Sequence, residues 1–222
     1  MQGANVTIEV TGISPGKATI SITMTESNVS KSVEVTVVEK SSETTFTIVA
    51  EVENGNSYNN LISKVVAYGW VEAEDDDIEI ATGNYANGGF TMTLPTPLNS
   101  KFLENIMDSE LGEWGDGDFT YSDVNAKICI IHKAGFEGYS SSGTNVGYFF
   151  YGSYYDPEVW VLYIYADRSV TISGSDDYTI LNVSLKQGWN IVYVSYDEDD
   201  ICTVSSEMPT VFVGMKWKFY AD

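Results

Sequence analysis

Val-Trp-Val-Leu-Tyr-Ile-Tyr-Ala, residues 159–166, is the longest uninterrupted apolar run of the chain. Eight residues match the length of a β-strand and fall far short of the roughly 18 apolar residues of a transmembrane helix. Side chains alternate in direction along a strand, so both faces of this one are apolar. One face must pack on the core. The other is either covered by a helix or a second sheet, or exposed as a binding platform.

Alternation of apolar and polar residues with a period of two continues on both sides of this run and indicates further strands. The segments with this pattern are residues 6–10, 18–24, 33–37, 46–52, 63–71, 90–94, 128–132, 181–185, 189–193 and 211–220. Two Gly-rich polar stretches, 113–123 and 135–147, predict loops. The sequence therefore predicts an all-β fold, an antiparallel β-sandwich. A partly open β-barrel is the alternative, because successive hairpins suit both.

One segment, residues 99–111, departs from the strand pattern. Phe102, Ile106 and Met107 fall on helical spacing, and Asn99 or Ser100 can cap the first helical turn. We expect one short helix here, lying over one end of the β core.

A polar stretch, Lys-Ser-Ser-Glu-Thr at residues 40–44, follows a valine-rich strand and is the expected domain boundary. The prediction is a small module over residues 1–40 and a larger β-sandwich domain over residues 41–222. A chain of 222 residues is long enough for one large β domain with a smaller module.

Residues 11–20, Thr-Gly-Ile-Ser-Pro-Gly-Lys-Ala-Thr-Ile, and the strand at 33–38 resemble the end of bacterial Ig-like modules. Such modules carry a G-v-s-P-G-x-A-T-I turn and finish on a valine-rich strand. The resemblance covers residues 5–39 and lacks the first half of the module. It implies a partial Ig-like module that serves in spacing and display on a cell surface, without chemistry of its own.

The larger part, about residues 44–220, resembles a domain of uncharacterised surface lipoproteins of Bacteroidota, of the gut Bacteroides type. The matching stretches are Val-Glu-Asn-Gly-Asn-Ser-Tyr-Asn at 52–59, Gly-Gly-Phe-Thr-Met-Thr-Leu-Pro at 88–95 and Leu-Lys-Gln-Gly-Trp-Asn at 185–190. The resemblance implies a cell-surface or secreted protein, an outer-membrane lipoprotein whose lipid anchor we expect outside the present sequence.

Charge and rare residues narrow the function classes. Eleven basic residues against 32 acidic ones give a formal net charge of −21, which disfavours nucleic acids and anionic membranes as partners. The chain has a single histidine, His132, which excludes His-clustered zinc sites and most His-based triads.

Cys129 and Cys202 are expected either as one disulfide or as two separately buried thiols.

No motif for nucleophilic, nucleotide-dependent or zinc-dependent catalysis occurs in the sequence, so we expect no enzymatic activity. A glycoside hydrolase with paired carboxylates is the least favoured alternative, because 32 acidic residues produce such pairs by chance. The expected function is that of a non-catalytic surface module for adhesion or glycan binding. The alternative is a structural or assembly protein that pairs through an edge strand at residues 216–220.

Aromatic residues are the first candidates for a glycan site, because flat rings stack on the apolar C–H faces of sugars. The candidate ligand-binding residues are Trp114, Tyr154, Tyr155 and Trp160. Packing in the core is the alternative explanation of these rings.

Acidic residues in one Gly-rich loop are the candidates for a Ca²⁺ site, because Ca²⁺ prefers oxygen ligands. The candidate ligands are Asp116, Asp118 and Asp123, whose spacing does not fit an EF-hand loop. A solvated turn without a bound ion is the alternative explanation. No other cofactor is expected.

Overall fold

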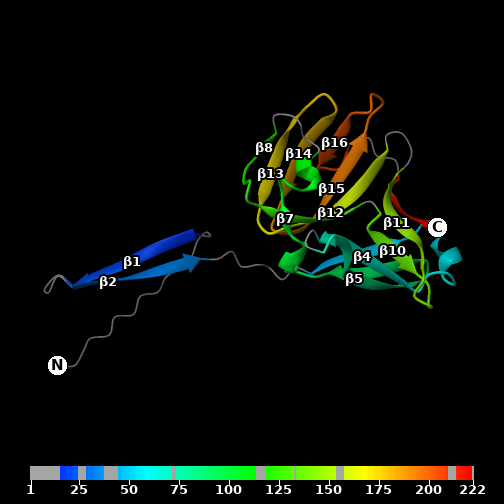
Figure 1. The fold of residues 1–222 in the computed structure, drawn as a ribbon, viewed down its shortest axis with the longest axis horizontal. Coiled ribbons are helices and arrows are strands. Elements are labelled where there is room, and N and C mark those ends of the chain that lie inside the picture. The colour runs from blue at the N-terminus through cyan, green and yellow to red at the C-terminus, as the bar shows by residue number, and fades with distance from the viewer. Residues whose placement is uncertain are drawn as a thin grey trace. The chain divides into compact units, whose positions relative to one another are not determined.

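The computed structural model divides the chain into two compact units, Met1–Ser42 and Glu43–Asp222, each described by itself. In the first unit, β1 (Gly16–Met24) and β2 (Val29–Val37) form a regular antiparallel hairpin, whose register runs from Gly16 opposite Val37 to Met24 opposite Val29 (Figure 1). The strand predicted at residues 6–10 lies outside the described residues. The structure describes residues 16–24, 29–37, 45–71, 74–113, 119–132, 134–153, 158–209 and 214–221.

The second unit is built on one sheet of fifteen strands, so the predicted all-β, sandwich-like fold is confirmed. The sheet is not closed into a barrel. Its strands are β3 (Phe46–Glu51), β4 (Lys64–Val71), β5 (Asp76–Ala86), β6 (Gly89–Leu94), β7 (Glu104–Asn105), β8 (Thr120–Tyr121), β9 (Lys127–Ile131), β10 (Phe136–Tyr139), β11 (Asn145–Ser153), β12 (Val159–Ala166), β13 (Val170–Ser175), β14 (Thr179–Leu185), β15 (Gly188–Tyr196), β16 (Cys202–Ser205) and β17 (Lys216–Ala221).

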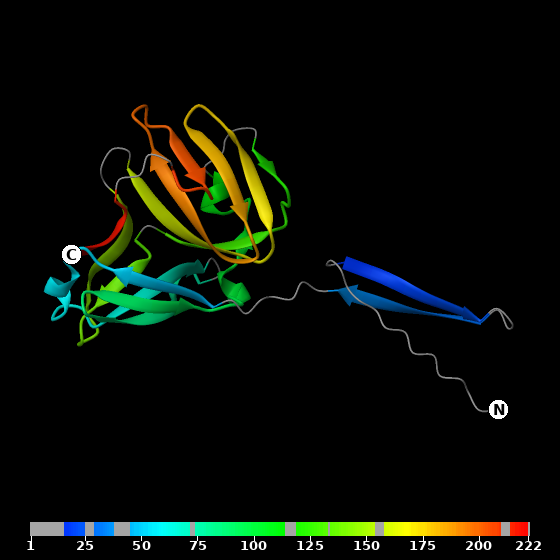
Figure 2. The ribbon, with the colours of Figure 1, turned by 180° about the vertical axis from the view of Figure 1, so that it is seen from behind.

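The strands follow one another in the order β3-β6-β5-β4-β10-β11-β12-β15-β16-β14-β13-β8. Three strands branch from this path: β17 pairs with β11, β9 pairs with β12, and β7 pairs with β9. The described pairs are antiparallel except β14 with β16. Strand β12 lies near the middle of the path, and the two halves of the sheet form the two lobes seen in Figures 1 and 2.

Two hydrophobic cores lie on opposite faces of β12. Val161 and Tyr163 belong to the first core, with residues of β3, β4, β6, β10, β11 and β17. Leu162 and Ile164 belong to the second core, with residues of β9, β13, β14, β15 and β16. Both faces of the apolar run 159–166 are therefore covered, and this strand does not form an exposed binding platform.

The prediction of one helix over residues 99–111 is wrong, because this segment contains a 3₁₀ turn, a short strand and only the start of an α-helix. Asn99 does cap a turn, since its side-chain oxygen accepts a hydrogen bond from the Lys101 amide at 3.0 Å, but that 3₁₀ turn (Ser100–Phe102) is only three residues long. The chain then enters β7, which pairs with β9, and the Ile106 amide donates to the Ala126 carbonyl. These sheet contacts outweigh the helical spacing. The only α-helix in the described part of the chain, α1 (Glu110–Glu113), starts at the end of the predicted segment.

The loop predicted over residues 135–147 is also wrong in part, because it contains strand β10. Phe136 and Gly138 both face the first core. A Cβ at Gly138 would lie 3.1 Å from the Phe219 ring and 3.2 Å from the Phe149 ring, so the glycine makes room for aromatic packing. In the sequence the same glycine is a loop signal.

The cysteines take the second of the two predicted forms: Cys129 and Cys202 are free and separately buried. Among the described helices, none is long and apolar enough to cross a membrane.

Candidate functional site

Of the seven residues predicted to bind a ligand or a metal, two lie in the described part of the chain. Trp114, Tyr154, Tyr155, Asp116 and Asp118 lie outside the described residues. Their roles stay predictions, and the described candidates are Trp160 and Asp123.

Trp160 lies at the start of β12 and packs at the margin of the second core. Its ring is half-buried and stacks on the ring of Tyr196, with centroids 5.4 Å apart and planes at 23°. Burial raises the pKa of Tyr196 to about 12. The structure thus places Trp160 in an aromatic pair, where part of the ring is already occupied by protein.

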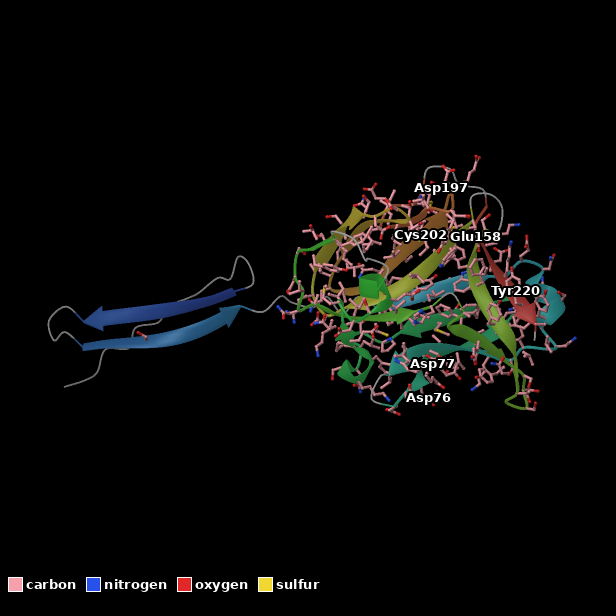
Figure 3. The ribbon with its side chains drawn as sticks, turned by 45° about the horizontal axis from the view of Figure 1, so that its top comes forward. Asp76, Asp77, Glu158, Asp197, Cys202 and Tyr220 are labelled. Carbon is pink, nitrogen blue, oxygen red and sulfur yellow. The ribbon has the colours of Figure 1, made fainter. Side chains whose placement is uncertain are left out.

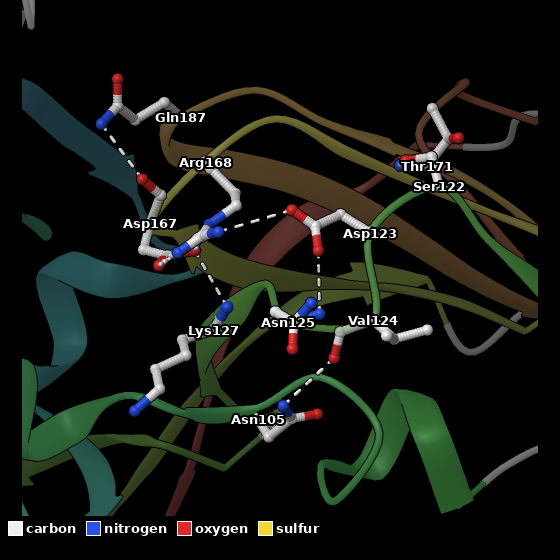
Figure 4. Close-up of polar contacts among 10 residues, drawn as sticks. All are labelled: Asn105, Ser122, Asp123, Val124, Asn125, Lys127, Asp167, Arg168, Thr171 and Gln187. Carbon is white, nitrogen blue, oxygen red and sulfur yellow. Dashed lines mark hydrogen bonds and ion pairs between the residues drawn. The ribbon is translucent and has the colours of Figure 1, made fainter. Parts of the chain in front are cut away.

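Asp123 faces the only arginine of the chain, Arg168 (Figure 4). The Arg168 guanidinium lies 3.4 Å from one carboxylate oxygen, and the other oxygen accepts a hydrogen bond from the Asn125 amide at 2.9 Å. The Asn125 amide and the Arg168 charge hold the pKa of Asp123 below its usual value. Arg168 also pairs with Asp167 at 2.9 Å. The negative charge of Asp123 is therefore balanced by Arg168.

Within the described ranges, no three His, Cys, Asp or Glu side chains gather closely enough to hold a metal ion. The thiols are also poorly suited to nucleophilic chemistry, which requires the thiolate. Burial raises the pKa of the Cys129 thiol to about 12, and burial also raises the pKa of the Cys202 thiol.

A second set of aromatic side chains, not among the predicted site residues, lies on the outer side of strands β4, β10, β11 and β17, on the face opposite the first core. We call it the outer aromatic face. Cross-strand registers place its members on one side of the sheet: β10 and β11 pair Glu137 with Tyr148, and β11 and β17 pair Tyr148 with Tyr220. Its rings are those of Tyr68 and Trp70 on β4, Tyr139 on β10, Tyr148 on β11 and Tyr220 on β17.

The rings are accessible in part. Trp70 is 41% exposed, and the four tyrosines are half-buried. Val66 lies between them on the same face yet is only 1% exposed, so the side chains of this face form a packed layer. With strands about 4.8 Å apart, the face is about 19 Å wide from β5 to β17. Figure 3 labels residues on the two outer strands, Asp77 opposite Trp70 on β5 and Tyr220 on β17.

Polar groups between the rings are held in place by hydrogen bonds. The Tyr139 hydroxyl donates to Glu137 Oε2 at 2.6 Å, and the Asn145 amide donates to the same oxygen at 2.8 Å. The hydroxyls of Tyr68 and Tyr139 lie 2.7 Å apart. On β5, Glu79 Oε1 accepts from the Thr82 hydroxyl at 2.7 Å. Desolvation and the hydrogen bond to Glu137 raise the pKa of Tyr139 far above its usual value, so it stays a neutral donor.

Lys64 Nζ lies 5.1 Å from the centre of the Tyr139 ring, and Lys218 shares a face of β17 with Tyr220. On β5 and β10 the neighbouring ionic groups of this face, Asp77, Glu79 and Glu137, are acidic. Fixed carboxylate oxygens beside accessible rings are groups that accept hydrogen bonds from hydroxyls while the rings bind an apolar surface.

A second surface feature is a groove of about 750 Å³ beside β3. Its apolar lining comes from Phe46, Tyr151, Tyr163, Ile191, Met215 and Trp217. Tyr151 and Trp217 are stacked, with centroids 5.2 Å apart. We call it the β3 groove.

The edge strand predicted at residues 216–220 is part of β17, which pairs with β11 along its length. On its other side, the Trp217 carbonyl accepts a hydrogen bond from the Glu53 amide at 2.8 Å, next to the isolated bridge between Val52 and Trp217. In the described residues β17 has no second partner strand, so it is an edge strand. The edge next to the groove, before Val52, belongs to β3.

The outer aromatic face was missed because its members come from strands that lie apart in the sequence. Tyr68 and Trp70 do share one face of the predicted strand 63–71, but Tyr139 fell in the predicted loop. The β10 strand that aligns them carried no alternation signal beyond Phe136, owing to Gly138.

No family model, curated protein or solved structure matches the chain.

Proposed function

We propose that this protein is a non-catalytic carbohydrate-binding module and that the outer aromatic face is its binding surface. The observation that carries the proposal is the placement of five partly accessible rings on one side of the sheet, with the hydrogen-bonded carboxylate of Glu137 among them. A contiguous exposed aromatic surface on a sheet is the kind of feature that marks a binding site.

The chemistry of the surface fits a sugar better than a purely apolar ligand. The rings offer flat surfaces for the C–H faces of a pyranose, and tyrosine and tryptophan combine an apolar body with a polar edge. Glu137 Oε2 accepts two hydrogen bonds, which fix the carboxylate, and a carboxylate has further acceptor capacity for other donors. Sugar hydroxyls are such donors.

The non-catalytic part of the proposal is supported by the raised pKa values of both thiols and by the pairing of the single histidine. His132 Nδ1 lies 2.8 Å from Glu110 Oε2. The proposed location, at the cell surface or secreted, rests on the resemblance of residues 44–220 to surface lipoproteins.

The test is a glycan array with the wild-type protein and the variant Trp70→Ala. We expect a related set of neutral glycans to bind and Trp70→Ala to lose at least about tenfold in affinity, because one stacked ring with its area contributes on the order of 1.4 kcal/mol or more. Tyr178→Ala is the matched control, since Tyr178 is a 75% exposed ring outside this face. It is expected to bind as the wild type does.

A second arm of the array, run with a chelator, tests the predicted Ca²⁺ ligands Asp116, Asp118 and Asp123. Binding that needs Ca²⁺ and is unaffected by Trp70→Ala would move the site away from the outer aromatic face. An array without any binding would contradict carbohydrate recognition itself.

A further inference from the structure

We propose that the β3 groove binds an extended polypeptide strand of a partner protein, which pairs with the free edge of β3. The groove shares no residue with the outer aromatic face, so this inference is independent of carbohydrate binding. It rests on three properties of the groove: unpaired backbone groups along one wall, an apolar floor, and an acidic end.

The backbone groups of β3 that point into the groove can be assigned from the hydrogen bonds at its end. Val52 N–H donates to the Gly88 carbonyl, on the side of β6, whereas Glu53 N–H donates to Trp217, on the opposite side. Direction alternates along a strand, so Thr47, Val49 and Glu51 direct their N–H and C=O groups to the side of Glu53. In the described residues, no strand pairs with that side of β3 before Val52.

A free edge of this kind is a template for another strand. Natural proteins commonly protect such edges with lysine, proline or a bulge. β3 has none of these, since its sequence is Phe-Thr-Ile-Val-Ala-Glu and its pairing with β6 is regular over all six residues. Val49, at its centre, is 77% exposed.

The floor of the groove defines which side chains the partner strand needs. Residues of a strand beside β3 would alternate between the floor and the outer surface. The floor consists of the apolar and aromatic side chains of Tyr163, Ile191 and Trp217, so every second residue of the partner should be apolar. On the outer side the partner would lie beside Thr47 and Val49, where β-branched residues make favourable cross-strand pairs.

Charge indicates a basic partner. Glu51 and Glu53 both line the groove, and the lining cation, Lys216, is paired with Glu53 at 3.1 Å. A lysine or arginine of the partner next to Glu51 would add an opposite charge. A second copy of the chain is disfavoured, because each copy carries a formal charge of −21 and would repel the other.

The probe is a capped, fluorescent peptide, Lys-Val-Thr-Val-Thr-Val-Lys, whose symmetry serves both strand directions. We expect saturable binding by fluorescence anisotropy to the full chain. The same composition without alternation, Lys-Val-Val-Thr-Thr-Val-Lys, should bind at least about tenfold more weakly, and so should a peptide with glutamates in place of the lysines. Of two peptides N-methylated on alternate sets of amides, only one should lose binding.

The decisive variant is Val49→Pro. Proline removes the N–H that faces the groove, and its ring obstructs a neighbouring strand, while the bonds from β3 to β6 involve the other residues. We expect at least a tenfold loss of peptide affinity with an unchanged circular dichroism spectrum. Val49→Thr keeps the N–H and is expected to bind within about threefold of the wild type. Thr47→Pro provides a second proline at the same edge if Val49→Pro does not fold.

Three results would overturn the proposal. The first is no peptide binding by the wild type, and the second is binding that Val49→Pro and Thr47→Pro leave unchanged. The third concerns residues 210–213, Thr-Val-Phe-Val, which precede Gly214 and lie outside the described residues. If the peptide binds only after Val211→Ser and Val213→Ser, the chain itself occupies the edge and no partner protein is needed.

Discussion

Strands β4 and β12 carry apolar or aromatic side chains on both faces, but the fold uses their second faces differently. On β12, Val161 and Tyr163 enter one core and Leu162 and Ile164 enter the other. On β4, one face enters the first core, while the other holds Tyr68 and Trp70 at the surface.

The difference comes from what the rest of the chain brings to each strand. β12 lies near the middle of the sheet, and strands β13 to β16, contributed by residues 170–205, supply a second core against it. Nothing in the described residues supplies a comparable layer over the outer face of β4. The same local pattern therefore yields a buried face in one strand and a candidate binding face in the other.

The largest expected effect is the difference in the free energy of unfolding between the variants Ile164→Ala and Trp70→Ala. Ile164 is fully buried in the second core, and removing its side chain should cost about 2–5 kcal/mol of the free energy of unfolding. Trp70→Ala should cost well under that, within about 1 kcal/mol, because the ring is 41% exposed. Urea denaturation followed by circular dichroism measures both.

Val66→Ala calibrates the comparison, because Val66 is on the outer face of β4 but buried. Loss of two buried carbon atoms should cost about 1.6 kcal/mol, between the other two variants. If Trp70→Ala proves as destabilising as Ile164→Ala, the outer face is a structural layer and the contrast between the two strands disappears.

The sequence predicted individual strands well because alternation reports the inner and outer sides of each strand directly. In the alternating segment 211–220, for example, Trp217 and Phe219 fall on one side of the strand, and both are buried. It failed where tertiary contacts decide the backbone. Gly138 is a glycine because two aromatic rings need the space, and the Ile106 amide bonds to Ala126 instead of to a helical turn.

The candidate site was harder to predict than the strands, because its rings meet only through strand pairing. Trp160 and Trp70 look alike in the sequence, each in an apolar strand. The fold stacks Trp160 on Tyr196, and it sets Trp70 on the same face as a tyrosine from β10, 69 positions further along the chain (139 against 70). Register between distant strands is set by the completed sheet, so neither environment follows from local pattern.

An intermediate effect is expected for Tyr139→Phe, which keeps the ring of the outer aromatic face and removes its hydrogen bonds. The hydroxyl contacts Glu137 and the hydroxyl of Tyr68, and its loss should cost about 1 kcal/mol of unfolding free energy. If the fixed carboxylate takes part in glycan binding, affinity should also fall severalfold. Asn145→Ala removes the other donor to Glu137 and is a second test of the same carboxylate, so it should also reduce affinity. Unchanged affinity in both variants would leave the rings alone as the binding groups.

The smallest effect is a pH dependence that separates the two regions. His132 directly follows β9, and its Nδ1 lies 2.8 Å from Glu110 Oε2 of α1. This contact with Glu110 is the main reason why the pKa of His132 is raised, and the charges of Glu110, Asp77 and Glu104 raise it further. A raised pKa means that the folded state binds the proton more tightly, so the stabilisation is fully present below the unfolded pKa of about 6.5 and is lost as pH rises through the folded value. Because the imidazole is half exposed, the gain should stay under about 1 kcal/mol.

On the outer aromatic face no such pH dependence is expected from Tyr139, because its raised pKa keeps the hydroxyl protonated from pH 5 to 9. The measurement is the free energy of unfolding at pH 5.5 and 8.5 for the wild type, His132→Gln and Tyr139→Phe. The carboxylates shared by all three proteins contribute the same pH dependence to each, so differences between variants isolate the substituted group. His132→Gln should lose stability at pH 5.5 more than at pH 8.5, whereas the cost of Tyr139→Phe should be equal at both. An equal cost of His132→Gln at the two pH values would show that the proton on His132 contributes nothing to the packing of α1 on the second core.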